Sequence, residues 1–83
     1  MSRSRPRATN VQVLDHELVV DLMDGRVISA PLVWFPRLLN ATAAQRGEWS
    51  LIGKGEGIHW PALDEDLSVE GLLRGAPAPG AKV

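Results

Sequence analysis

Cysteine is absent from this sequence, and histidine occurs only twice. Without cysteine the chain has no disulfide framework and no thiolate zinc site, which fits a cytoplasmic protein. No apolar run approaches the roughly 18 residues that a membrane span requires, so no membrane partner is expected. The net charge of −1 gives no overall attraction to nucleic acid, which is therefore the less favoured partner.

What the chain does contain is enough apolar sequence for one small domain. Its 83 residues are 45% hydrophobic and 23% charged, as in an ordinary soluble protein. A core of this size leaves a thin stability margin, so we expect part of the apolar surface to meet a partner or a second copy in a homodimer. Composition divides the chain into a disordered basic arm over residues 1–7, a folded domain over residues 8–74, and a disordered Pro/Gly/Ala tail over residues 75–83.

The spacing of apolar residues predicts an α+β domain, with a small antiparallel sheet in the order β-β-β-α-β-β-α and helices packed on the sheet. Asp24-Gly25 is a strong hairpin-turn signal, since both residues tolerate a positive φ. Pro36 suits the first turn of a helix, Pro61 ends a strand, and Ser68 is an N-cap candidate. The predicted elements are strands over residues 10–14, 18–22 and 26–30, a helix over 36–47, strands over 49–52 and 58–60, and a helix over 69–73.

His59 is the side chain that most resembles a catalytic or metal-binding group. Neighbouring side chains of a strand point to opposite faces, so if Ile58 and Trp60 face the core, His59 faces outward or lines a groove. A general base or a metal ligand would need partners, and no second ligand lies at a meaningful spacing. We therefore favour a histidine at the end of a strand, hydrogen-bonded to a nearby carboxylate.

Three successive acids, Asp64, Glu65 and Asp66, stand just before the last predicted helix. Carboxylate oxygens are ligands that a divalent cation prefers, but the run lacks the spacing of a calcium loop. A solvated loop, or electrostatic support for the helix N-terminus, is favoured over a metal site. A contact patch for a basic partner also ranks above metal, and neither a metal nor a cofactor is expected.

The aromatic side chains are Trp34, Phe35, Trp49 and Trp60. Core packing between helix and sheet is the expected role, whereas an exposed Trp34 or Phe35 at the helix start would mark a binding edge. The glycine-rich run over residues 53–57 predicts a hairpin turn, because it lacks the Walker spacing of a phosphate loop. No serine, histidine and acid form a triad pattern, so the sequence does not indicate an enzyme.

Two segments carry a resemblance to a known family: Ile58-His59-Trp60-Pro61, and the stretch from Asp64 to Leu73. Together with the Asp24-Gly25 turn and Trp34-Phe35-Pro36, they make the chain similar to the bacterial domain of unknown function 2442 family, over nearly all of residues 8–75. The resemblance implies a small α+β domain and a short, single-domain member. It also implies that such members are often encoded beside another small protein, and look like the antitoxin half of a toxin–antitoxin pair.

Three functional hypotheses follow. The first is a protein-interaction module, an antitoxin-like partner of a small toxin-type protein encoded by the adjacent gene. The second is a nucleic-acid-associated regulator that uses the arginine arm, and the third is a small ligand-binding domain around His59 and Asp64. In the nucleic-acid hypothesis, the backbone phosphates would be contacted by Arg3, Arg5 and Arg7. In the protein-interaction hypothesis, the residues expected to contact the partner are Trp34, Phe35, His59, Asp64, Glu65 and Asp66.

Overall fold

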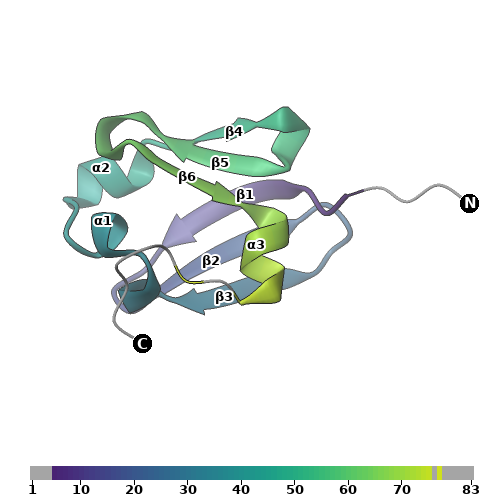
Figure 1. Ribbon diagram of the computed structural model, residues 1–83, viewed down its shortest axis with the longest axis horizontal. Helices are drawn as coiled ribbons and strands as arrows, with labels where there is room; N and C mark the ends of the chain where they lie inside the picture. Colours follow the sequence, from purple (N-terminus) through teal and green to yellow (C-terminus); the bar gives the residue numbers. More distant parts are fainter. Residues whose placement is uncertain (1–4, 76, 78–83) are drawn as a thin grey trace, which may run out of the picture.

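A meander of three antiparallel strands forms the first part of the chain (Figure 1). The computed structural model describes residues 5–75 and residue 77. The strands are β1 (Ala8–Val13), β2 (Glu17–Leu22) and β3 (Val27–Pro31). Gly25 makes the β2–β3 turn with a φ of 95°, so the turn predicted from Asp24-Gly25 is present. One face of the meander belongs to the core, because Leu18, Val20 and Leu22 alternate along β2 and are all buried.

A second antiparallel sheet follows, made of β4 (Ser50–Ile52), β5 (Gly57–Trp60) and β6 (Glu65–Ser68). β4 and β5 form the hairpin expected from the glycine-rich run, and β5 ends where Pro61 predicts. The sequence predicts a solvated acidic loop where the structure has β6. That strand forms because pairing with β5 satisfies the backbone of residues whose own strand propensity is low.

The helices are short: α1 (Pro36–Leu39), α2 (Ala43–Gly47) and α3 (Val69–Arg74). Single 3-10 turns connect the strands and helices: η1 (Leu32–Trp34), η2 (Gly53–Gly55) and η3 (Pro61–Leu63). Pro36 begins α1 and Ser68 caps α3, both as predicted. The helix predicted over residues 36–47 is divided in two. α1 ends at Leu39 with Asn40 as its C-cap, and Thr42 caps the start of α2 through reciprocal hydrogen bonds with Gln45.

Arg46 ties the two short helices to the second sheet. Its Nε donates to the Leu38 carbonyl at 2.9 Å and its Nη2 donates to the Leu39 carbonyl at 2.8 Å, which satisfies the last carbonyls of α1. The carbonyl of Arg46 in turn accepts a hydrogen bond of 3.1 Å from Trp60 Nε1. The buried indole of β5 therefore has its polar atom paired within the core.

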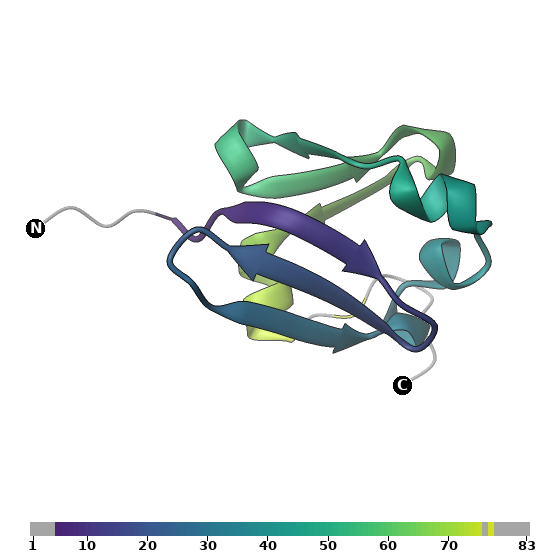
Figure 2. The ribbon, with the colours of Figure 1, turned by 180° about the vertical axis from the view of Figure 1, so that it is seen from behind.

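The core lies between the meander and a mixed layer of helices and the second sheet. Figures 1 and 2, which show opposite sides, agree that α3 covers one face of the β1–β3 sheet and that the β4–β6 sheet runs beside β1. Buried apolar side chains from the first sheet, from β5, from α1 and from α3 meet there. The largest fully buried ones are Trp60, Phe35, Leu18, Leu32, Leu38, Ile58, Val20 and Val69.

The described part of the predicted basic arm, residues 5–7, lies beside the end of β2. The Arg7 carbonyl accepts a hydrogen bond of 2.8 Å from the Met23 amide, and Ala8 is buried at the start of β1. Residues 1–4 of the arm, with Arg3, fall outside the described residues, as do residues 76 and 78–83 of the predicted tail. Gly75 closes α3 with a φ of 72°.

The α+β class and the order of elements predicted from the sequence are confirmed, with two small antiparallel sheets carrying the strands. Within the described residues, no helix has the length and apolar character needed to cross a membrane.

Candidate interaction surface

The outward face of the β4–β6 sheet gathers side chains from all three strands. The strand register places Ser50 opposite His59 and His59 opposite Asp66, so these three residues form one row across the sheet. Residues two positions along a strand share a face, so Ile52, Gly57 and Ser68 form a second row on the same side. We call these two rows the outer face of the second sheet.

His59 takes the role favoured from the sequence. Ile58 and Trp60 on either side of it are fully buried, and the half-exposed His59 donates through Nδ1 to Oδ1 of the exposed Asp66. A carboxylate that accepts from Nδ1 fixes the ring orientation and leaves Nε2 as the open nitrogen. Ser50 stands next in this row, yet within residues 5–75 no hydrogen bond joins it to His59.

β4 is an edge strand, and all three of its residues are exposed. Among the described strands it pairs only with β5. Leu51 and Ile52 expose 36% and 44% of their surface. Ile52 lies across Gly57, where an added Cβ would come within 2.9 Å of Ile52 Cγ1, so the glycine lets the isoleucine lie flat on the sheet. The edge therefore offers both unpaired backbone groups and apolar side chains.

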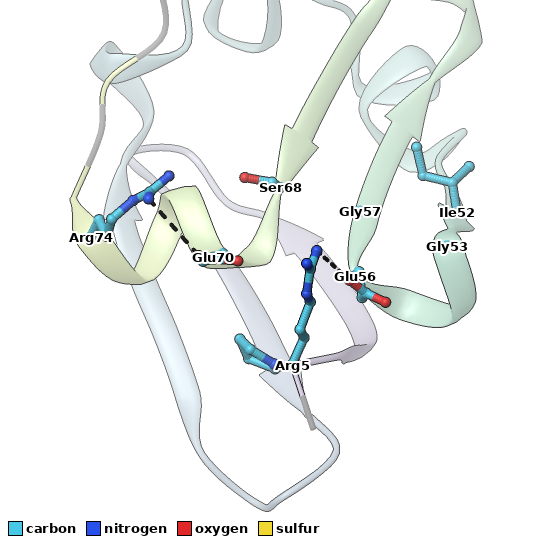
Figure 3. A pocket seen from close by; sticks show the side chains of 9 residues that line it. Arg5, Ile52, Gly53, Glu56, Gly57, Ser68, Glu70 and Arg74 are labelled. Atoms are coloured by element: carbon cyan, nitrogen blue, oxygen red, sulfur yellow. Dashed lines mark hydrogen bonds and ion pairs between the residues drawn. The ribbon is translucent and has the colours of Figure 1, made fainter. Parts of the chain in front are cut away.

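A cavity of about 350 Å³ opens at the Ile52–Ser68 end of this face (Figure 3). Its charged lining consists of two ion pairs: Arg5 Nη1 to Glu56 Oε1 at 3.4 Å, and Arg74 Nη1 to Glu70 Oε1 at 3.9 Å. Three of the four side chains are largely exposed, and Glu56 is exposed to 38%. Solvent-screened pairs of this kind contribute about 0–1 kcal/mol. Each charge can therefore exchange its present partner for one on another molecule.

The three acids that the sequence groups together lie in three different settings. Asp66 is exposed on the outer face, whereas Glu65 points inward beneath the sheet, opposite Trp60, and is buried. Burial raises the pKa of Glu65 above its ordinary value, and the positive charge of Arg37 only partly opposes this shift. Asp64 occupies the turn after η3 with a φ of 50°, and its carbonyl accepts a hydrogen bond from Arg37 Nη1.

The aromatic pair before α1 also separates. Phe35 is fully buried and belongs to the core, as the packing interpretation expects, while Trp34 is half-buried and packs against the core cluster. The Trp34 ring lies beside Gly75 at the end of α3. Of the six residues named from the sequence as partner contacts, the outer face brings together only His59 and Asp66.

The structure adds residues that the sequence interpretation does not include. Four residues, Ile52, Glu56, Glu70 and Arg74, join the surface because the end of β4, the turn η2 and the helix α3 meet around the cavity. The side of the sheet on which Ile52 lies could have been predicted from the sequence, because residues alternate along a strand and Ile52 therefore lies on the face opposite Leu51. The cavity itself depends on tertiary packing.

His59 and Asp64, proposed as the centre of a ligand site, do not line this cavity. No group of three or more potential metal ligands is found in the described part of the chain.

The sequence of this chain matches the family model described as protein of unknown function (DUF2442) over residues 8–78, and the chain belongs to that family. It is similar to a crystal structure of a protein of unknown function from Rhodospirillum rubrum, with 31% identity and a TM-score of 0.78, covering 94% of this chain and 96% of that one. It is also similar to the solution structure of an uncharacterised protein from Chromobacterium violaceum, with 25% identity and a TM-score of 0.73, covering 89% of this chain and 70% of that one. No curated protein matches.

Proposed function

We propose that this protein is a protein-interaction module, and that it binds another small protein through the outer face of the second sheet and the β4 edge. The observation that carries the proposal is the exposure of β4 along its whole length, with Leu51 and Ile52 among its three residues. Proteins commonly protect such an edge with charge, proline or a covering segment. Here the edge strand carries two aliphatic side chains.

The chemistry of the edge favours an extended segment of the partner. A strand added beside β4 would use the backbone N–H and C=O groups that face away from β5, and alternate side chains would meet Ile52 and Leu51. A three-residue strand supplies few hydrogen bonds, so side-chain contacts must add to the affinity. Ile52 is the central apolar contact because it lies on the outer face beside the cavity.

The cavity supplies charge complementarity next to that apolar contact. Its two cations and two anions alternate around the opening, and both ion pairs are long and exposed. A partner side chain of either sign finds an opposite charge there, and the positions of these charges fix the register of the added strand. Asp66, exposed on the same face, favours a basic group at the other end of the contact.

The finer proposal is an antitoxin-like role. It rests on the family resemblance, which implies that short members are often encoded beside another small protein. In this proposal the partner is the toxin-type product of the adjacent gene, and the two meet in the cytoplasm. A homodimer through β4 uses the same edge and would compete with that partner.

Co-expression of the chain with the adjacent gene product tests both the interaction role and the antitoxin-like role. We expect a complex that survives size-exclusion chromatography with light-scattering detection, and hydrogen exchange that slows at residues 50–52 when the complex forms. If the partner arrests growth alone, co-expression should restore growth. The absence of any complex would rule out the proposed function. A complex without growth arrest would leave the interaction module and remove the antitoxin role.

A further inference from the structure

A second cavity, of about 310 Å³, lies between the N-terminal segment and the β2–β3 turn. Arg5, Arg7 and Arg26 line it together with Pro6, Met23 and Asp24. Arg5 and Pro6 also line the cavity beside the outer face, so they separate the two cavities. This second site is distinct from the β4 edge and shares only Arg5 and Pro6 with the first.

The lining carries an excess of positive charge. Asp24 is the single acid in the lining, beside three arginines. Its carboxylate is already paired with Arg26, because it accepts from the Arg26 backbone N–H at 3.0 Å and from Arg26 Nε at 2.7 Å. The guanidinium groups of Arg5 and Arg7 have no acid of their own inside the cavity, because the Glu56 that pairs with Arg5 lies outside its lining. The excess of two positive charges in the lining therefore complements one doubly negative anion.

Arg7 is held in position and lacks a partner for a buried donor. Its carbonyl accepts from Met23, and its Cβ lies against Gly55, where an added Cβ would come within 3.2 Å of it. Its Nε is closed to solvent, and no hydrogen-bond acceptor is found for it among the described residues. A buried guanidinium N–H without an acceptor is destabilising. A bound anion that accepts hydrogen bonds from the Arg7 guanidinium would remove this cost.

Arg5 is free to join such an anion. It is strongly exposed, and its only described ion pair, to Glu56, is 3.4 Å long. An anion in the cavity competes with Glu56 for this side chain, whereas Arg7 is held by its backbone hydrogen bond to Met23 and by the burial of its Nε. A guanidinium that can leave its exposed partner and one that is held in place line the same cavity. Such a pair suits a tetrahedral oxyanion, which accepts hydrogen bonds on several sides.

We infer that the Arg5–Arg7–Arg26 cavity binds a phosphate group. Guanidinium forks bind phosphate oxygens in pairs, and the phosphate is either a free small anion or part of a nucleic-acid backbone. The proposal does not depend on the protein-interaction role, since the Ile52 edge takes no part in it.

The test is a titration of the full chain with inorganic phosphate, at constant ionic strength maintained with chloride, followed by backbone amide NMR shifts. We expect saturable shifts at Arg5, Arg7 and residues 23–26. The substitution Arg7→Gln, and separately Arg5→Gln at an exposed position that leaves the fold intact, should each weaken binding about tenfold. The control Lys54→Gln removes an exposed cation that lines neither cavity and should leave phosphate binding unchanged.

A parallel titration with a short single-stranded DNA distinguishes the two sources. Shifts at the same amides, lost in Arg7→Gln and displaced by phosphate, assign the site to a nucleic-acid backbone. Phosphate binding without DNA binding assigns it to a free anion. The inference is overturned if phosphate produces no shifts beyond those of chloride, or if Lys54→Gln weakens phosphate binding as much as Arg7→Gln.

Discussion

Replacing Gly55 with alanine tests how the N-terminal segment is joined to the second sheet. Gly55 is buried in η2, has a φ of 95°, and lies against the start of β1. A Cβ added there would come within 2.8 Å of the Ala8 carbonyl oxygen and 3.2 Å of Arg7 Cβ. Gly25 provides a matched control, because it has the same φ of 95° and nothing lies within 4 Å of its added Cβ.

Comparing the two substitutions separates the cost of backbone strain from the cost of the steric contact with Ala8. Placing an L-residue in the left-handed region costs about 1–2 kcal/mol, and this applies equally to Gly25→Ala and Gly55→Ala. The contact with Ala8 involves the backbone, which cannot rotate away as a flexible side chain would. Overpacking of this kind costs about 1–3 kcal/mol more, so we expect Gly55→Ala to lose about 2–5 kcal/mol and Gly25→Ala only the smaller part.

Urea unfolding, followed by tryptophan fluorescence at pH 7, measures both losses. We expect the slope of the unfolding free energy against urea to be the same in both variants, so that the midpoints report stability alone. The result that would refute the reasoning is an equal loss of stability in the two variants. Arg7 would then not be held against η2, and the preorganisation argued for the phosphate site would fail with it.

Two further predictions concern Glu65 and the cap of α3. Because burial raises the pKa of Glu65 from its ordinary value of 4.5, the folded state binds more protons above that pH, so the free energy of unfolding should fall as pH rises through the window between 4.5 and the raised pKa. Glu65→Gln should remove this fall in urea titrations run from pH 4 to pH 8, and an unchanged slope would contradict it. Ser68 Oγ accepts from the Gly71 amide at 2.9 Å, so Ser68→Ala should lose about 1 kcal/mol in urea unfolding. The exposed Ser29→Ala serves as control, and equal losses would remove the capping argument.

Local signals account for most of the fold that the sequence predicts. The Asp24-Gly25 turn, the Pro36 helix start, the Pro61 strand end and the Ser68 cap each depend on the backbone preferences of the residues themselves. The facing of β5 follows from the two-residue period, which buries Ile58 and Trp60. These features need no knowledge of what lies nearby in space.

Two features of the fold are missing from the sequence prediction. The strand β6 depends on pairing with its neighbour, and the division of the first predicted helix depends on a local signal that the prediction did not use. β6 carries acids with low strand propensity, and it forms because β5 supplies the hydrogen-bond partners. Its pleat then separates Glu65 from Asp66, which the sequence treats as one acidic patch. The division between α1 and α2 could have been predicted from Thr42 and Gln45, whose spacing is that of a capping box.

The measurement that most directly tests the interaction surface is the affinity of two variants for the small protein encoded by the adjacent gene. Ile52→Lys places a charge on the β4 edge, and Val27→Lys places the same charge at another exposed apolar strand position, in the first sheet. If the β4 edge is the contact, Ile52→Lys should weaken binding by about thirtyfold or more, as expected for a central contact, and Val27→Lys should leave it unchanged. Equal affinities of the two variants would place the partner elsewhere and contradict the proposed surface.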